Sequence, residues 1–148
     1  MNKLKFAMPL AIAALFCACK KEKDDPKTNE EKLLGSWTYV SITADRPVIW
    51  NDGDTPTKDG LAHLPTCVKD DYIVLKANNV SEQNEGATKC DPDDDQVITS
   101  DWSLDGTKLI IDGEEYKLIT VNGSTFKAST TGEYEGEEVT ITLTLKRK

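Results

Sequence analysis

Apolar and polar residues alternate along most of the chain after residue 33. The clearest case is residues 138–146, where Val139, Ile141, Leu143 and Leu145 are separated by three threonines and a lysine closes the run. A period of two predicts half-buried strands, because successive side chains of a strand point to opposite faces. No window of this part keeps apolar residues at helical spacing for more than one turn. We therefore expect an all-β domain.

Turn signals divide this part of the chain into eight short segments. The dipeptides Asp105-Gly106, Asp112-Gly113 and Asn122-Gly123 are typical of tight hairpins, because their residues tolerate positive φ. The strands that we expect are 36–43, 71–76, 80–84, 97–104, 107–111, 114–121, 125–129 and 138–146. Successive hairpins without a helical crossover predict an antiparallel meander. Either an up-and-down barrel or a sandwich could hold eight such strands, and the near-continuous hairpins favour the barrel.

The first nineteen residues have a different pattern. Lys3 and Lys5 precede an apolar run over residues 6–17, which is too short for a membrane span of about 20 helical residues. A basic start followed by a short apolar run is typical of a secretory signal peptide. The run ends at Ala18-Cys19, which resembles a bacterial lipobox, where a small residue precedes the cysteine that is acylated. An ordinary signal peptide with incidental cysteines is the alternative.

Residues 20–32 contain no aliphatic or aromatic side chain, so they can bury nothing and predict a solvated tether. A helix with mixed charges is disfavoured there by Pro26 and by the missing apolar stripe. The expected organisation is a lipoprotein signal peptide over 1–18, a lipidated N-terminus and flexible tether over 19–32, and a β-barrel domain over 33–148. Several acyl chains, such as palmitate, on Cys19 would hold the exported protein at the bacterial outer membrane, on its periplasmic or cell-surface side.

The composition excludes several classes of function. With 26 acidic and 18 basic residues the net charge is −8, which argues against nucleic acid as a partner. The chain has no phosphate-binding glycine loop, no zinc spacing and no hydrolase nucleophile elbow. A catalytic cysteine would need a base, and the one histidine, His63, is expected to be a surface imidazole with its hydrogen bonds satisfied. We therefore expect no enzyme, no cofactor and no metal.

The acidic run over residues 91–95 is the one feature that suggests a cation. An EF-hand would need glycine at Gln96 and a bidentate glutamate at Trp102, so that pattern fails. We interpret the run as a solvated acidic turn, with a weak cation site as the lesser alternative.

A set of motifs resembles a known family. Gly35 and Trp37 form a glycine–x–tryptophan motif that opens the first strand, and Trp102 precedes a later turn and strand. Cys67 and Cys90 lie between them. Together with the lipobox, these features resemble the lipocalin-like domains of Bacteroidetes secreted lipoproteins.

The resemblance covers residues 33–146 and implies a lipocalin-like barrel. The chain is shorter than a full lipocalin and lacks its C-terminal helix, so a large ligand cavity is not implied. Independently of the family, we expect Trp37 to plug one end of the barrel, with Gly35 giving the incoming chain room beside the indole. Trp102 is expected to pack in the core.

Two further expectations concern the loops. Cys67 and Cys90 bracket the hairpin over 71–84, and an exported compartment permits disulfides, so we expect them to be bonded rather than free. The long loop over residues 44–66 holds Val48, Ile49 and Trp50, an apolar patch that we assign to ligand binding at the end opposite Trp37. Trp50 is either folded back as a lid or exposed as a contact residue, and the sequence leaves both open.

Two classes of function fit these features. The first is a membrane-anchored binding module for a small apolar or amphipathic ligand. The second is a structural or interaction lipoprotein with a filled barrel whose loops contact a protein or glycan partner. A continuous interior cavity of several hundred cubic ångströms would favour the first class. A core closed by large side chains would favour the second, the candidates being Trp37, Tyr72, Trp102, Leu118, Phe126 and Leu143.

Overall fold

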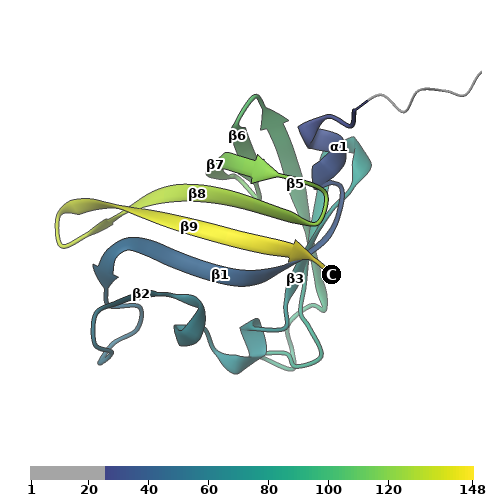
Figure 1. Cartoon of the computed structure of the whole chain (residues 1–148). Helices are drawn as coiled ribbons and strands as arrows, with labels where there is room; N and C mark the ends of the chain where they lie inside the picture. Colours follow the sequence, from purple (N-terminus) through teal and green to yellow (C-terminus); the bar gives the residue numbers. More distant parts are fainter. Residues whose placement is uncertain (1–25) are drawn as a thin grey trace, which may run out of the picture.

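The computed structural model describes residues 26–148. The signal peptide, Cys19 and the first part of the tether lie outside the described residues. One α-helix and nine strands form the fold (Figure 1): α1 (Asn29–Leu33), β1 (Gly35–Val48), β2 (Thr57–Asp59), β3 (Tyr72–Leu75), β4 (Val80–Asn84), β5 (Val97–Asp105), β6 (Lys108–Ile111), β7 (Glu114–Val121), β8 (Thr125–Tyr134) and β9 (Glu137–Arg147). Short 3-10 turns cover Leu61–His63, Thr66–Val68 and Ala77–Asn79. Within residues 26–148, none of the helices is both long and apolar enough for a membrane crossing.

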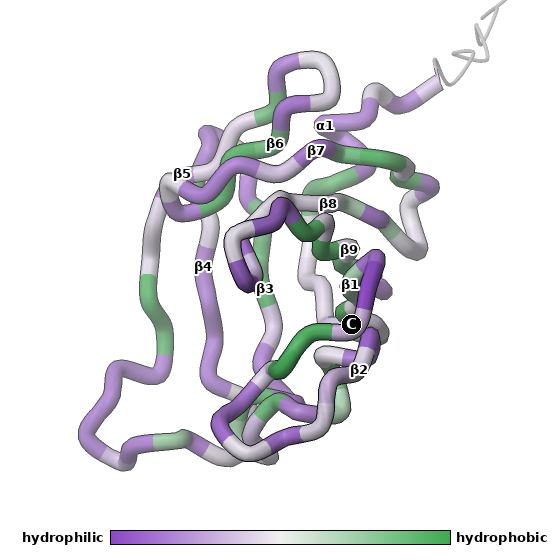
Figure 2. The backbone as a smooth tube through the Cα atoms, turned by 90° about the vertical axis from the view of Figure 1, so that its left-hand side faces the viewer, coloured by the Kyte–Doolittle hydropathy of each residue, from purple (hydrophilic) through white to green (hydrophobic). Residues whose placement is uncertain are grey.

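The strands close into a ring. From β3 to β9 each strand pairs with the next in antiparallel fashion, β3 pairs with β1, and β9 pairs back with β1. All eight predicted strands are present, and the prediction of an eight-stranded antiparallel barrel is confirmed. The ring is uneven: the long strands β1, β8 and β9 run together to one side, while β3, β4 and β5 lie on the other side, with β3 joined to the first residues of β1 (Figures 1 and 2).

The long strands extend past the predicted boundaries because they find partners there. β1 continues to Val48, with Ala44 paired to Ile141 of β9. Its other edge pairs with β2, where Val48 faces Thr57. The segment after residue 43 was expected to be loop, since it carries charges and a proline, but long-range pairing overrides this local preference.

The helix α1 corrects the expected tether. Residues 29–32 were assigned to an unstructured segment, yet they form the body of α1. Thr28 and Glu31 make a capping box that satisfies the first backbone N–H groups of the helix. Leu33, the last residue of the helix, is fully buried in the barrel core. The cap and this one apolar anchor account for a helix in a sequence that has no apolar stripe.

Trp37 fills the end of the barrel that α1 covers, as the sequence predicted. It is fully buried, and its indole N–H donates to the carbonyl of Leu33 at 2.6 Å. Phe126 of β8 meets it edge to face, with 4.9 Å between ring centroids. The guanidinium of Arg147 covers the indole at 4.4 Å from the centroid. We call this the closed end of the barrel.

The side chain of Arg147 holds the segments of the closed end together through hydrogen bonds. Its guanidinium donates to the carbonyls of Lys32 at 2.9 Å, Leu34 at 2.8 Å and Gly123 at 2.6 Å. One side chain near the C-terminus thus joins β9 to the α1–β1 junction and to the β7–β8 turn. Gly35 adopts φ +126°, and a Cβ there would overlap Arg147 Nη1. The room that Gly35 leaves beside the indole is therefore occupied by the guanidinium.

Cys67 and Cys90 form the predicted disulfide, with an S–S distance of 2.00 Å and Cα atoms 5.2 Å apart. The bond joins the loop between β2 and β3 to the loop between β4 and β5. Hydrogen bonds reinforce it, because Asp71 Oδ1 accepts from the backbone N–H of Gly86 at 2.9 Å and Asp70 Oδ2 accepts from that of Ala87 at 2.5 Å. The two loops therefore form one unit.

The first prediction concerns Arg147. Replacing it with alanine removes three hydrogen bonds and the contact with Trp37, and should lower the free energy of unfolding by about 1–3 kcal/mol. Urea denaturation followed by tryptophan fluorescence measures the change. Arg147→Lys should not restore stability, because an ammonium cannot reproduce the fork of donors. Lys146→Ala, at an exposed neighbouring position, should stay within about 0.5 kcal/mol of the original protein. Equal stability of the two alanine variants would contradict the role of Arg147.

The second prediction concerns the disulfide. A double Cys67→Ala/Cys90→Ala variant should lose roughly 3 kcal/mol of stability, because the bond restricts the unfolded chain over 23 positions. Far-ultraviolet circular dichroism should remain that of a β-protein, since the pairing of the ring does not pass through the bond. Thermal unfolding with and without a reductant gives the matched comparison in the original protein. An unchanged melting temperature in both tests would show that the bond constrains nothing.

Candidate ligand-binding site at the open end of the barrel

The end opposite Trp37 is formed by long loops. β1 starts at the closed end, so the loop that follows it leaves at the other end, as predicted. Because the strands alternate in direction, the β4–β5 loop and the β6–β7 and β8–β9 turns reach the same end. We call it the open end.

Residues that face the interior of the barrel continue along the strands as far as the open end. Directly paired residues of antiparallel strands share a face, and Ile73 pairs with the buried Trp37 and with Gln83. Gln83 in turn pairs with Ile98, so both point inward. Ile98 is nevertheless 51% exposed. Among the described residues, Ile98 is therefore a large apolar side chain that faces the interior and yet remains exposed.

A small apolar cavity lies deeper in the barrel. Its volume is about 30 Å³, room for one or two water molecules at most. Its lining comes from β1, β3, β6, β7, β8 and β9: Tyr39, Ile73, Leu109, Ile111, Tyr116, Phe126, Ala128, Leu143 and Leu145. The deep interior is thus nearly filled.

A larger side pocket of about 190 Å³ begins where this cavity ends, since Tyr39 and Ile73 line both. Its further lining is Ile42, Leu64, Val68, Asp71, Tyr72 and Gln83. Leu64 and Val68 come from the β2–β3 loop and cover it from outside. Each space is smaller than the roughly 300 Å³ at which ligand pockets usually begin. Two wider hollows, of about 570 and 530 Å³, have lysine and acidic residues in their linings and lie against the outer faces of β7–β8 and of β1–β2.

Two tyrosine hydroxyls supply polar groups in the deep cavity. Burial raises the pKa of Tyr39 to about 12, and Tyr116 and Asp71 add to the effect. Burial also raises the pKa of Tyr116, with Glu114 and Asp112 contributing. Both hydroxyls therefore stay protonated at physiological pH and can donate a hydrogen bond to a ligand.

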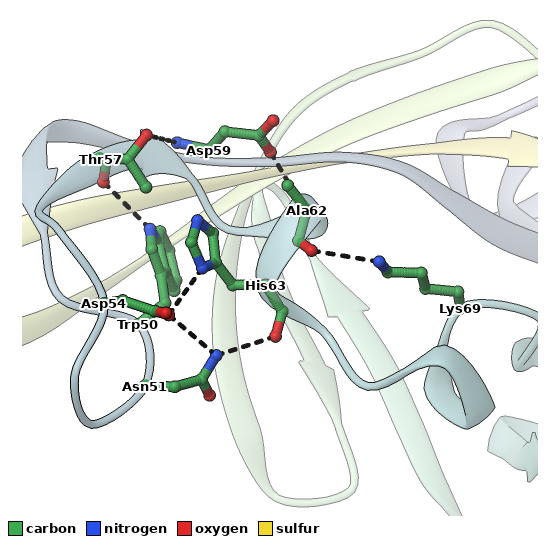
Figure 3. Close-up of polar contacts among 8 residues, drawn as sticks. All are labelled: Trp50, Asn51, Asp54, Thr57, Asp59, Ala62, His63 and Lys69. Carbon is green, nitrogen blue, oxygen red and sulfur yellow. Dashed lines mark hydrogen bonds and ion pairs between the residues drawn. The ribbon is translucent and has the colours of Figure 1, made fainter.

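Trp50 lies folded back against its own loop (Figure 3). Its indole N–H donates to the carbonyl of Thr57 at 3.0 Å, and a Cβ on Gly60 would lie only 2.7 Å from its ring. Of the two alternatives for Trp50, this arrangement favours the lid. Val48 is buried beside it and Ile49 is exposed. The three residues that the sequence assigned to a ligand do come together, but around a different pocket.

That pocket has a volume of about 180 Å³ and lies between the end of β1 and the β8–β9 hairpin. It is lined by Val48, Ile49, Trp50, Gly132, Glu133, Tyr134, Val139 and Ile141. It shares no lining residue with the deep cavity or with the side pocket. We treat it as a surface hollow next to the open end.

His63 has a structural role in the same loop (Figure 3). Its Nδ1 lies 2.6 Å from Asp54 Oδ2, and Asn51 Nδ2 donates to Asp54 Oδ2 at 3.2 Å and to the His63 carbonyl at 3.0 Å. The hydrogen bond with His63 holds the pKa of Asp54 below its usual value. The imidazole is thus a partly exposed group whose hydrogen bond is satisfied, as expected. Within residues 26–148 no three histidine, cysteine or acidic side chains are placed to hold a metal ion.

The sequence did not single out Tyr39, Ile73 and Tyr116 as site residues. They could have been found from the strand alternation, since each shares the parity of a core residue on its own strand: Trp37 on β1, Leu75 on β3 and Leu118 on β7.

Comparison of the chain with protein-family models and with curated proteins gives no match, so the lipocalin-like resemblance stays a prediction that depends on its motifs.

Proposed function

We propose that this protein is an exported, membrane-anchored lipoprotein whose barrel binds a small apolar or amphipathic molecule at its open end. One observation carries the proposal. The closed end is sealed by Trp37 and Arg147, whereas at the open end the inward-facing Ile98 remains exposed. A barrel that served only as a rigid support would have its interior filled to both ends.

The exposed inward face supplies the binding energy. Covering apolar surface is favourable by about 25 cal/mol per Å², so a ligand seated against Ile98, Ile73 and Gln83 would gain from the apolar parts of that wall. The Tyr39 and Tyr116 hydroxyls would orient a polar group of the ligand. These are the features of small-molecule sites in general: mostly apolar walls with a few polar groups.

The size of the spaces limits the ligand. Only a small or narrow group fits the deep cavity and the side pocket. A larger ligand would have to displace Leu64 and Val68, which belong to a loop and can move more easily than the paired wall. The expected ligand is therefore partly inside the barrel and partly in contact with the β2–β3 loop.

The second candidate is an interaction lipoprotein with a filled barrel. The cavity of about 30 Å³ favours it, because the deep core is almost closed. The disulfide-linked loops would then be the contact surface for a protein or a glycan. The two candidates share the open end and differ in whether the occupant enters the barrel.

The membrane anchor is part of the same proposal. The lipobox at Ala18-Cys19 and the charged segment that follows support acylation of Cys19. The described structure adds that α1 and the closed end lie where this segment meets the barrel (Figure 1). The tether would leave from the closed end, so the open end would be free to meet a ligand.

The third prediction tests binding at the open end with Nile red, a neutral dye that fluoresces in apolar sites. The original protein should bind it, and Ile98→Lys should weaken binding about tenfold, since it places an ammonium at the apolar mouth. Ile119→Lys is the matched control, because Ile119 is 47% exposed against 51% for Ile98 and follows the buried, inward-facing Leu118 on β7, so it lies on the outer face. No binding by the original protein, or equal loss in both variants, would favour the second candidate.

The fourth prediction tests the anchor in a bacterial host that processes lipoproteins. Cys19→Ala should release the protein into the soluble fraction and abolish incorporation of labelled palmitate. Cys17→Ala is the matched control and should leave both unchanged, because Phe16 rather than a small residue precedes Cys17. Membrane retention of the Cys19→Ala variant with label still incorporated would overturn the assignment.

A further inference from the structure

The charged side chains around the interior site are of one sign. Neither the deep cavity nor the side pocket has a lysine, arginine or histidine in its lining. The side pocket has a carboxylate, Asp71. Glu114 and Asp112 stand at the edge of the deep cavity, beside Ile111. The distribution of charge at the open end can therefore discriminate between ligands.

Asp71 is held in place and is largely dehydrated. It is only 5% exposed, and its Oδ1 accepts a hydrogen bond from the backbone N–H of Gly86 at 2.9 Å. Its negative charge acts on the interior, because it contributes to raising the pKa of the Tyr39 hydroxyl. A carboxylate with so little water around it acts on a nearby ligand charge more strongly than a surface carboxylate would.

Glu114 and Asp112 act on the other side of the interior. Glu114 pairs with Ile111, which lines the deep cavity, and its exposed side chain lines the hollow of about 570 Å³ together with Glu115 and Lys117. Asp112 lies in the β6–β7 turn next to it. Both contribute to raising the pKa of the Tyr116 hydroxyl. The two tyrosines that face the cavity are thus both subject to negative charge.

The basic groups nearest the open end are engaged elsewhere. Lys58 donates to the Asp45 carbonyl and Lys69 to the Ala62 carbonyl, and both line the hollow outside β1. Arg46 is paired with Glu137. The ammonium of Lys148 lies over the ring of Tyr72, which lines the side pocket, at 3.3 Å from the ring centroid. None of these four cations is itself a lining residue of the deep cavity or of the side pocket.

We propose that the interior site is selective for a cationic amphiphile, a ligand with an apolar body and an ammonium-type head, and that it rejects anionic amphiphiles such as fatty acids. The inference depends on the proposed binding function and adds the class of ligand. The apolar body would lie against Ile73 and Ile98, and the head would be placed against Asp71 of the side pocket, with Glu114 acting from the open end. An anion in the same position would meet Asp71 without a base in the pocket lining to compensate its charge.

The experiment uses three amphiphiles with the same chain: octylamine, octanol and octanoate. Each displaces Nile red from the full chain near neutral pH, where the amine is protonated and the acid is ionised. Octylamine should displace the dye at concentrations roughly tenfold lower than octanoate, with octanol between them. The ratio of octylamine to octanoate affinity should fall as salt is added, because part of the attraction comes from the exposed Glu114.

Three variants test whether carboxylates at the open end are responsible for the ratio of octylamine to octanoate affinity. Glu114→Gln should reduce the ratio several-fold, and so should Asp71→Asn, which keeps an oxygen to accept from Gly86. Glu115→Gln is the matched control: it removes the same charge one position away, on the outer face, where Glu115 is paired with Lys108. The control should leave the ratio unchanged. Circular dichroism of each variant verifies that it has folded.

Each other outcome has a distinct meaning. Equal displacement by octylamine and octanoate, or an unchanged ratio in both Glu114→Gln and Asp71→Asn, would overturn this inference and leave the binding function in place. A loss in Glu115→Gln as large as in Glu114→Gln would also overturn it, because net charge rather than Asp71 and Glu114 would then be responsible. If Nile red does not bind, or if none of the three compounds displaces it, the proposed binding function itself fails.

Discussion

The stacking of Arg147 on Trp37 is the interaction on which the rest of the structure depends. The last residue of the last strand closes the ring by pairing with Trp37 on the first strand, and its guanidinium then reaches the carbonyls of Lys32 and Leu34. The seam of the barrel and its closed end are thus fixed by the same side chain. Because that end is filled by large rings and by Leu33, the space that remains lies toward the opposite end.

The open end needs a second constraint, since its loops are long and the strands on that side are short. β3 and β4 have four and five residues, and each is followed or preceded by irregular chain. The disulfide between Cys67 and Cys90 fixes the two loops to each other. The disulfide does not connect these loops to the β8–β9 hairpin. The open end therefore has two loops that are covalently linked to each other on one side, and the β8–β9 hairpin, which is not linked to them, on the other.

Local sequence patterns were sufficient to predict the wall but not the contents of the barrel. All eight strands of the ring were predicted: the alternation along residues 138–146 and the Asp-Gly and Asn-Gly turns marked five of them, and the turn at residues 77–79 separated two more. The helix at Asn29–Leu33 was missed because its stability comes from a cap and a buried Leu33 rather than from a periodic face. Arg147 was missed because its hydrogen-bond partners Leu34 and Lys32 lie 113 and 115 residues away. The near-filled cavity depends on how nine side chains from six strands meet, which no local pattern encodes.

The two candidate functions follow from one feature, the depth to which the barrel is filled. The closed end and the deep cavity leave little volume, so a ligand would extend outward past Ile98 toward the rim. There it would contact the disulfide-linked loops that a protein or glycan partner would also contact. Asp71 of the side pocket would act on such a ligand at this depth, between the nearly filled core and the loops. The proposed ligand would then be selected by its chemistry at the open end, and by its size in the small space beneath.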